Sequence, residues 1–393
     1  MESPRSDGGA PTPRGTGSTQ LQASPVASSE VQHEPPRAVP QPQTSPGGPS
    51  VRQRPFWSEA LEPYSQPHLG RSMAGLATSV VPYVALTVAM YMTLGVSYWV
   101  VLALAIPAAG FLLRTYILFH DCTHGSYLSS RRANGILGVA LGLIVYAPFA
   151  NWRHNHVVHH ATAGDLDRRG VGDVPTLTVA EYMAKTWGAR LGYRLFRNPL
   201  VMFGLGPLFA LVIGPRLVSR SMRPRLRRSV IGTNLALAVL VGGLCLLVGW
   251  REYLLVQLPT VLLAGSAGVW LFYVQHQFED TYWQSTDGWS YADAALRGSS
   301  YLKLPRVLQF FSGNIGLHHI HHLSARIPNY NLQRAHDENP IFHGVPTISL
   351  WDGLRAVRLK LWDERRRRLV TFAEARSGER DAPAGALLLD RAH

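Results

Sequence analysis

Charged side chains are scarce in this chain of 393 residues. Asp, Glu, Lys and Arg together make up 16% of it, whereas hydrophobic residues make up 46%. The apolar residues are concentrated in a few runs with almost no charge, and the core helices of soluble proteins rarely lack charge for so long. The scarcity therefore argues against a large soluble protein and favours an integral membrane protein.

Cysteine is nearly absent, because only Cys122 and Cys245 occur. Cys122 lies inside a histidine-rich motif and Cys245 inside an apolar run. Two cysteines in such settings indicate neither a disulfide framework nor a metal site made of thiolates.

Acidic residues are outnumbered by basic ones, 25 against 38, and the formal net charge is +13. A basic surface of this kind can meet nucleic acid or anionic lipid. Here the arginines cluster beside the apolar runs, so lipid headgroups explain them better. We therefore expect membrane lipids as partners and no nucleic acid.

Residues 1–55 are rich in Pro, Ser, Gly, Gln and Thr and show almost no apolar periodicity. Such a composition is typical of disordered segments. No charged start followed by an apolar stretch appears, so a secretory signal peptide is not expected. We expect a disordered N-terminal tail, then a membrane domain over residues 56–350, then a C-terminal segment over residues 351–393.

Four apolar runs are long enough to cross a membrane. They cover about residues 73–96, 98–119, 230–249 and 253–275. At a rise of about 1.5 Å per residue, each helix spans the hydrocarbon core of about 30 Å. Very short links join the first two runs and the last two, so the pattern predicts an all-α membrane protein with four transmembrane helices in two hairpins.

Two further apolar stretches, residues 135–149 and 199–218, are ambiguous. The loop 216–228 carries six arginines, and residues 151–198 are also basic. Basic loops stay on the cytoplasmic side, so the segment 199–218 should lie in the interface or re-enter rather than cross once. This orientation puts both termini and a histidine-rich helical cap on the cytoplasmic side.

The C-terminal segment contains Trp351, Leu354, Val357 and Leu361 at helical spacing, with arginine and lysine between them. The spacing predicts an amphipathic helix followed by a tail. Such a helix either lies on the membrane surface or packs as a cytosolic helix.

Sixteen histidines are present, and eight of them form three clusters. The clusters follow the patterns HxxxH, HxxHH and HxxHH, and their members are His120, His124, His156, His159, His160, His318, His321 and His322. Residues at i, i+3 and i+4 project from one helical face, so each cluster aims two or three imidazoles at one place. Neutral imidazole is a good ligand for iron, copper, zinc and nickel.

A ninth histidine, His276, follows the fourth apolar run, as His120 follows the second. Nine such ligands are more than one ion binds, so the pattern predicts two metal ions at the cytoplasmic boundary of the membrane. His154 and His319 fall outside the spacing and are expected behind the ligands or in an interface. His336 has no motif around it and is expected to be an ordinary residue.

The ordered segments HDCTH, HNHVVHH and GNIGLHHIHHL resemble the membrane fatty acid desaturases, and the resemblance covers about residues 75–350. Residues 159–167 and 327–331 are most similar to the acyl-lipid branch of the omega-6 (delta-12) type. The resemblance implies two iron ions, O₂ as co-substrate and a fatty acyl lipid as substrate. It also implies an external electron donor, ferredoxin or a cytochrome b5-like protein, and a bacterial inner membrane with the histidines facing the cytoplasm.

The family's iron ligands correspond to the eight clustered histidines and to His276. In structurally known animal relatives an asparagine one turn before this last histidine holds a metal-bound water, but this chain has Phe272 there. Asn314, one turn before His318, either takes that place or shapes a turn. Asp121 is one of several nearby acids that either accept an imidazole N–H or balance arginines. The other acids are Asp165, Asp167, Asp173, Glu279 and Asp280.

Related and unrelated functions remain as alternatives. Carotenoid ketolases or hydroxylases and alkane hydroxylases have comparable histidine clusters, but they insert oxygen rather than remove two hydrogens. All of these enzymes need an oxidant made from O₂, because an unactivated C–H bond yields to neither a base nor a nucleophile. A metal transporter needs ligands near the bilayer midplane, and every cluster here lies outside the predicted spans, so transport is disfavoured.

An acyl chain needs a long apolar slot that leads to the metals. Apolar and aromatic residues next to the ligands are candidates for its walls, although each is also explained by packing at a helix end. They are Phe119, Tyr146, Phe149, Trp152, Trp270 and Phe272.

Overall fold

The computed structural model describes residues 55–380, and this part of the chain is mostly helical. The N-terminal tail expected over residues 1–55 lies outside the described residues, apart from Pro55. The end of the expected C-terminal tail, residues 381–393, lies outside them as well.

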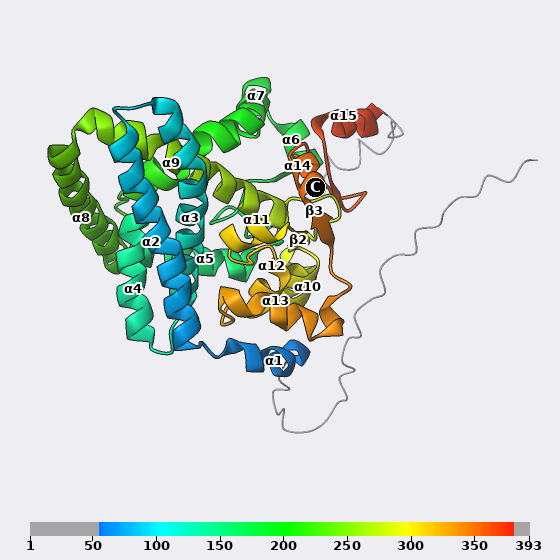
Figure 1. The fold of residues 1–393 in the computed structure, drawn as a ribbon. Helices are drawn as coiled ribbons and strands as arrows, with labels where there is room; N and C mark the ends of the chain where they lie inside the picture. Colours follow the sequence, from blue (N-terminus) through cyan, green and yellow to red (C-terminus); the bar gives the residue numbers. More distant parts are fainter. Residues whose placement is uncertain (1–54, 381–393) are drawn as a thin grey trace, which may run out of the picture. The chain divides into compact units, whose positions relative to one another are not determined.

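Four long helices coincide with the four predicted spans. They are α2 (Leu69–Thr93), α3 (Tyr98–His124), α8 (Pro224–Val248) and α9 (Trp250–His276). Each is long and apolar enough to cross a membrane. Helix α2 packs along α3, α3 also packs along α9, and α9 packs along α8 (Figure 1). That these helices cross the membrane as two hairpins, with the histidines on the cytoplasmic side, stays a prediction.

Helix α3 runs five residues beyond the predicted span. Gly125 ends it with a φ of 74°, and the Gly125 N–H donates to the carbonyls of Asp121 and Cys122. Glycine adopts this left-handed conformation without the steric cost of a side chain. The extension keeps His120 and His124 on the same long helix.

The two ambiguous apolar stretches belong to bent helix pairs. Helices α4 (Arg131–Ile144) and α5 (Phe149–Thr162) meet at 102°. Helix α7 (Trp187–Phe196) meets the helical segment Leu200–Arg216 at 55°. That segment is made of η2 (Leu200–Leu205), η3 (Leu208–Ile213) and η4 (Gly214–Arg216). Counting each bent pair as one span raises the number of candidate spans from four to six.

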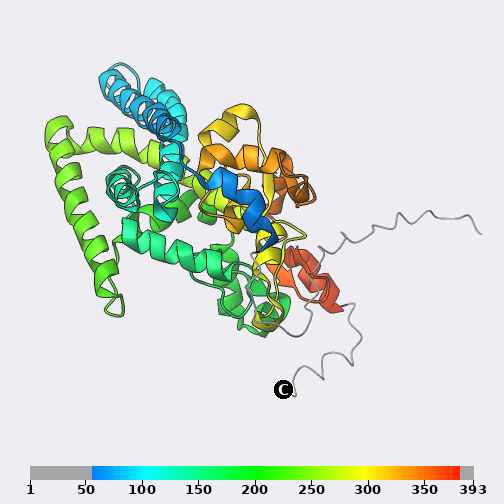
Figure 2. The same ribbon diagram turned by 90° about the horizontal axis from the view of Figure 1, so that it is seen from below.

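Short helices make up most of the remaining structure. Their bounds are α1 Phe56–Leu61, η1 Glu62–Ser65, α6 Val179–Ala184, η5 Thr286–Gly288, α10 Tyr291–Leu296, α11 Arg306–Phe311, α12 His318–Leu323, α13 Asn329–Asp337, η6 Pro340–Phe342, α14 Leu350–Ala356 and α15 Phe372–Arg380. Helices α10 to α13, coloured yellow to orange, lie together on one side of the long helices (Figures 1 and 2).

The prediction of an all-α protein is wrong in one respect, because two small sheets are present. In the first, β4 (Leu361–Asp363) pairs in parallel with β1 (Leu177–Thr178) and antiparallel with β5 (Arg368–Val370). In the second, β2 (Tyr301–Lys303) pairs in parallel with β3 (Thr347–Ser349). These strands have two or three residues each and most pair with distant segments, so no local periodicity marks them in the sequence.

The predicted C-terminal amphipathic helix is also too long. Helix α14 ends at Ala356, and Leu361 instead lies fully buried in β4. Leu361 pairs with Leu177 and Val370 there, which outweighs its helical spacing from Trp351. Pairing with distant strands therefore overrides the local pattern.

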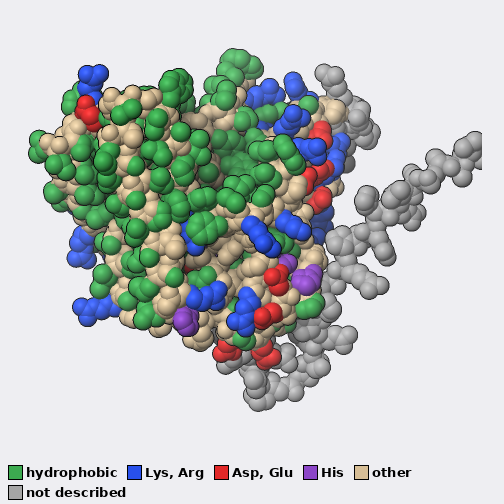
Figure 3. All heavy atoms as spheres, in the orientation of Figure 1, with side chains coloured by type: hydrophobic (Ala, Val, Ile, Leu, Met, Phe, Trp, Pro, Cys, Tyr) green, Lys and Arg blue, Asp and Glu red, His purple; other side chains and the backbone are tan. Residues whose placement is uncertain are grey.

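Charge and apolarity are separated on the surface. Figure 3 shows hydrophobic side chains over most of the face that the long helices form, with charged side chains mainly along its lower and right-hand borders. On α8, Val239, Leu246 and Leu247 are 78%, 91% and 79% exposed. Large apolar side chains exposed along such a helix fit contact with lipid rather than water.

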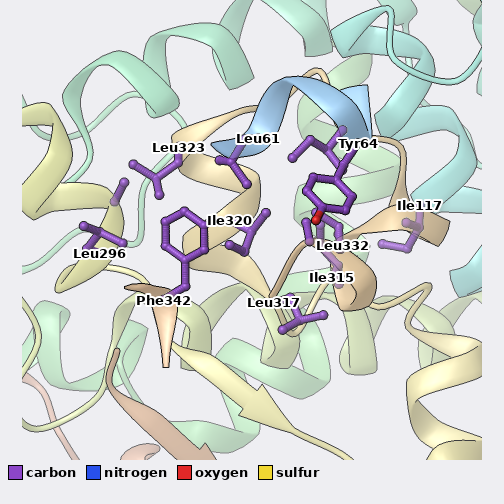
Figure 4. Packing of buried hydrophobic residues seen from close by; sticks show 13 residues of the cluster. Leu61, Tyr64, Ile117, Leu296, Ile315, Leu317, Ile320, Leu323, Leu332 and Phe342 are labelled. Carbon is purple, nitrogen blue, oxygen red and sulfur yellow. The ribbon is translucent and has the colours of Figure 1, made fainter. Parts of the chain in front are cut away.

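A hydrophobic cluster underlies the histidine-bearing helix α12. It brings together Leu61 of α1, Ile117 of α3 and Leu332 of α13 around Ile320 and its neighbours (Figure 4). Burying side chains from four separate helices stabilises their relative positions, since each buried aliphatic side chain contributes about 1.5–3 kcal/mol.

Candidate metal centre

All nine predicted ligands come together in two neighbouring groups. The first group consists of His120, His124, His156, His160 and His321, and the second of His159, His276, His318 and His322. Within each group the nearest ring nitrogens all lie within 4.8 Å of one another. The first group is built from α3, α5 and α12, and the second from α5, α9 and α12.

The nitrogen spacing in the first group suits one bound ion. The Nε2 atom of His156 lies 2.9 Å from that of His120 and 3.1 Å from that of His160. The Nε2 atoms of His160 and His321 are 3.0 Å apart. Two imidazole nitrogens bound at right angles to one ion, each at about 2.1 Å, are about 3.0 Å from each other.

The second group has the same spacing. The Nε2 atom of His318 lies 3.0 Å from that of His276 and 3.1 Å from that of His322. The Nε2 atoms of His124 and His159, one in each group, are buried without a hydrogen-bond partner. Buried nitrogens are normally paired, so these unpaired atoms fit positions that a metal ion satisfies.

Helices α5 and α12 each supply ligands to both groups. On α5, His156 and His160 belong to the first group, whereas His159 belongs to the second. On α12, His321 belongs to the first group and His318 to the second. The i, i+3, i+4 spacing therefore places the two metal positions side by side, one on each flank of these helices.

The opposite face of α12 explains why its histidines point toward the metal positions. Ile320 and Leu323, three residues apart, are buried in the cluster with Phe342 and Leu296 (Figure 4). Because these two apolar side chains fix the rotation of a six-residue helix, His318, His321 and His322 point away from the cluster.

The outer nitrogens of three histidines have oxygen partners. The Nδ1 atom of His120 lies 3.4 Å from an Asp121 carboxylate oxygen, and Nδ1 of His159 contacts Asp173 closely. The Nδ1 atom of His276 lies 3.0 Å from the carbonyl oxygen of Gly298. An acceptor at Nδ1 favours the tautomer in which Nε2 carries a lone pair for a metal.

Asp121 is itself held in place, because its other oxygen accepts from the backbone N–H of Asn329 at 2.7 Å and from its side chain at 2.8 Å. Asn314 donates to the Asn329 carbonyl at 3.1 Å and has a φ of 59°. The Asn314 side chain is therefore linked to His120 through Asn329 and Asp121.

The sequence did not single out Asp173 among the acids or Gly298 at all. The structure distinguishes Asp173 because Asp165 and Asp167 instead organise their own loop with Arg168 and Thr286. A backbone carbonyl such as that of Gly298 carries no residue-specific signal in any sequence. The fold was therefore needed to single out Asp173 among the six candidate acids and to find the Gly298 carbonyl.

The remaining histidines of the motifs lie outside both groups. His319 is fully buried, and its Nε2 atom lies 3.2 Å from Nδ1 of His336. Burial, reinforced by the neighbouring His336, lowers the pKa of His319 to about 3. His154 lies half-buried on α5 and belongs to neither group.

The local environment favours neutral, ligand-competent imidazoles. On α12, burial reinforced by neighbouring imidazoles lowers the pKa of His318, His321 and His322 well below its ordinary value. A neutral imidazole offers a lone pair, whereas a protonated one does not.

Of the six predicted channel residues, Trp152 contacts the first group directly, and Phe119, Phe149 and Tyr146 pack in the same region. Phe119 contacts Phe149 and Trp152 at ring distances of 6.0 and 5.3 Å, and Trp152 stacks on His156 at 4.5 Å. Tyr146 packs against a second hydrophobic cluster, which contains Phe119, Leu118 and Leu141.

The other two predicted channel residues differ from each other. Phe272 lies 5.1 Å from His159 and 5.6 Å from His276, ring to ring, and lines a cavity of about 10 Å³. Trp270 instead packs against Gly353 of α14. That any of the six lines an acyl channel stays a prediction.

Comparison with known proteins identifies the family. The model of the family described as fatty acid desaturase matches residues 97–351. A fatty acid desaturase of Bacillus subtilis is 45% identical over 309 residues, which cover 79% of this chain and 88% of that protein.

More distant relatives have more specific names. An sn-1 oleoyl-lipid 12-desaturase of Synechocystis is 27% identical and covers 57% of this chain and 64% of its own length. An sn-1 acyl-lipid omega-3 desaturase (ferredoxin) of the same organism is 28% identical, and the match covers 56% of this chain and 62% of that protein. The family match, the close relative and the histidine groups agree: the chain belongs to the fatty acid desaturase family and is an oxidoreductase.

Proposed function

We propose that this protein uses two irons and O₂ to introduce a cis double bond into a fatty acyl chain that is attached to a membrane lipid. The observation that supports this most is the pair of all-histidine groups, five and four residues, which include three histidines at the ends of the long apolar helices α3 and α9. Two irons bound there would supply, with O₂ and electrons, an oxidant strong enough for an unactivated C–H bond.

The protein's own residues would position the ligands and the substrate. Asp121, Asp173 and the Gly298 carbonyl hold three imidazoles with their Nε2 atoms inward. Phe119, Phe149, Trp152 and Phe272 would line the apolar slot near the irons, where fixed walls determine which two methylenes react.

Two finer points of the proposal rest on relatives. One Synechocystis relative is named for action at position 12 of an oleoyl lipid, so we propose delta-12 or omega-6 desaturation of a lipid-linked chain. Another is named with ferredoxin, so we propose an external ferredoxin-like donor, with a cytochrome b5-like protein as the alternative. The proposed location is a bacterial inner membrane, with the histidines on the cytoplasmic side.

Lipid analysis tests this proposal. The full chain is expressed in a host whose lipids contain only saturated and monounsaturated chains, and new double bonds are mapped by mass spectrometry. We expect dienes from the wild-type protein and from His154→Ala, and none from His156→Ala, which lies on the same helix but within a metal-binding group. Hydroxylated products in place of dienes would point to oxygen insertion and contradict desaturation.

A further inference from the structure

A second cavity lies outside the two histidine groups. It has a volume of about 250 Å³ and lies between α2, α3 and the start of α13. Arg71 and Thr78 of α2, Arg114 of α3 and Tyr330 of α13 are among its lining residues. Among the described residues that line it there is no acidic side chain and none of the nine candidate metal ligands.

Arg114 is unusual in its surroundings. It is the only lysine or arginine in the 27 residues of α3, a helix apolar enough to cross a membrane. One of its Nη atoms donates to the Phe310 carbonyl, and its guanidinium lies 4.0 Å from the centre of the Phe310 ring. Its Nε atom is buried without a partner. A cation in such a position is costly unless an anion balances it.

Arg71 faces the same cavity and is fixed in place. It donates to the Asn331 side chain and to the Tyr330 carbonyl, both at 2.7 Å, and stacks over the Tyr330 ring at 4.5 Å. In the described part of the chain, neither Arg71 nor Arg114 has a carboxylate within 4.0 Å. Two held guanidinium groups at one cavity, with no carboxylate of the described residues beside them, are suited to bind an external anion.

The position of the cavity beside apolar helix faces favours a lipid headgroup as the anion. Arg71 lies in the first turn of α2, and Arg114 lies about 9 Å along α3 from His120, toward the apolar middle of that helix. Met73 and Val81, which also belong to α2, are exposed apolar side chains. Cations beside exposed apolar helix faces meet lipid headgroups at the membrane boundary.

We propose that this cavity binds the phosphate of a membrane glycerophospholipid, with Arg71 and Arg114 as the two cationic contacts. The lipid's acyl chains would then lie along the exposed apolar face of α2. The proposal does not depend on desaturation, because a lipid held here can be detected whether or not the protein turns over.

Native mass spectrometry of the purified full chain tests the site with two matched lipids. Phosphatidylglycerol and monogalactosyldiacylglycerol carry the same two acyl chains in this test, but only the first has a phosphate. We expect phosphatidylglycerol to be retained about tenfold better by the wild-type protein, and this preference to be lost in Arg71→Gln and Arg114→Gln. Arg114→Lys should keep part of it, because the positive charge remains.

The control is Arg131→Gln, which removes an exposed arginine at the start of α4 that does not line the cavity. It should retain phosphatidylglycerol like the wild type. If Arg114→Gln fails to fold, Arg71→Gln still decides, because the Arg71 side chain is exposed.

Three results with the lipids and variants would overturn the proposal: equal retention of the two lipids by the wild type, an unchanged preference in Arg71→Gln, or an equal loss in Arg131→Gln. A final arm adds inorganic phosphate. Displacement of phosphatidylglycerol by free phosphate at equal concentration would show a general phosphate site and contradict a lipid site.

Discussion

At the scale of single residues, the division of the histidines into two groups makes a prediction about iron. His321 belongs to the first group and His318 to the second, although both lie on α12. Replacing either one with alanine should lower the bound iron from about two ions per chain to about one and abolish turnover, because each change opens one of two separate sites.

The matched control on the same helix is His319→Gln, since His319 lies between the two ligands and contacts His336 instead. This variant should keep both irons, as measured by elemental analysis of the purified protein. Loss of both irons from each ligand variant would mean that the two groups do not bind metal independently.

A second residue-level prediction concerns Lys360. Its side chain is only 6% exposed, its Nζ atom has no hydrogen-bond partner, and burial together with nearby Arg197 lowers its pKa to about 7. The pKa of Lys360 in the folded chain lies below its pKa in the unfolded chain. At a pH between these two pKa values, the unfolded chain therefore binds more protons than the folded chain. The contribution of Lys360 to the free energy of unfolding therefore rises as the pH increases from about 7 to about 10.5.

Lys360→Met removes this charge while keeping an unbranched side chain. We expect the variant to be more stable than the wild type near pH 7 and this advantage to shrink near pH 9. Thermal unfolding of the purified proteins at both pH values measures it. The same difference at both values would show that Lys360 does not titrate in this range.

At the scale of elements, α12 depends on the packing behind it. Ile320 is fully buried between the histidines of α12 and the cluster around Phe342. Ile320→Ala should lower the free energy of unfolding by about 2–4 kcal/mol, because it removes buried methyl groups and leaves a cavity. The control Ile341→Ala shortens a side chain that is 56% exposed, so it should lower the free energy of unfolding by less than about 0.5 kcal/mol. Equal effects of the two changes on the denaturation midpoint would contradict this account of α12.

Elements that repeat a local pattern could be predicted from the sequence, and elements that depend on distant partners could not. The four long helices follow from uninterrupted apolar runs. The histidine spacing marked eight members of the two groups, and the position of His276 after the fourth run marked the ninth. Leu361 was assigned to a helix because its pairing with Leu177 and Val370 has no local signature. For the same reason the sequence could not separate Asp173 from the other five candidate acids or point to Gly298, since both reach their histidines only in the folded chain.

At the scale of the whole molecule, orientation in the membrane is the prediction that remains open. The six arginines of residues 216–228 favour the cytoplasmic side for that loop. Reporter tags inserted in this loop and after residue 370 should therefore both report a cytoplasmic location. A tag in the loop that reports the opposite side would make the bent segment from α7 to Arg216 a true span.

The central claim is that two all-histidine groups hold two irons, and the metal content of the purified full chain tests it most directly. We predict about two irons per chain, with X-ray absorption showing nitrogen-rich ligation and no sulfur ligand, since neither group contains a cysteine. A preparation with stoichiometric zinc that still forms double bonds, or iron bound through sulfur, would contradict the account.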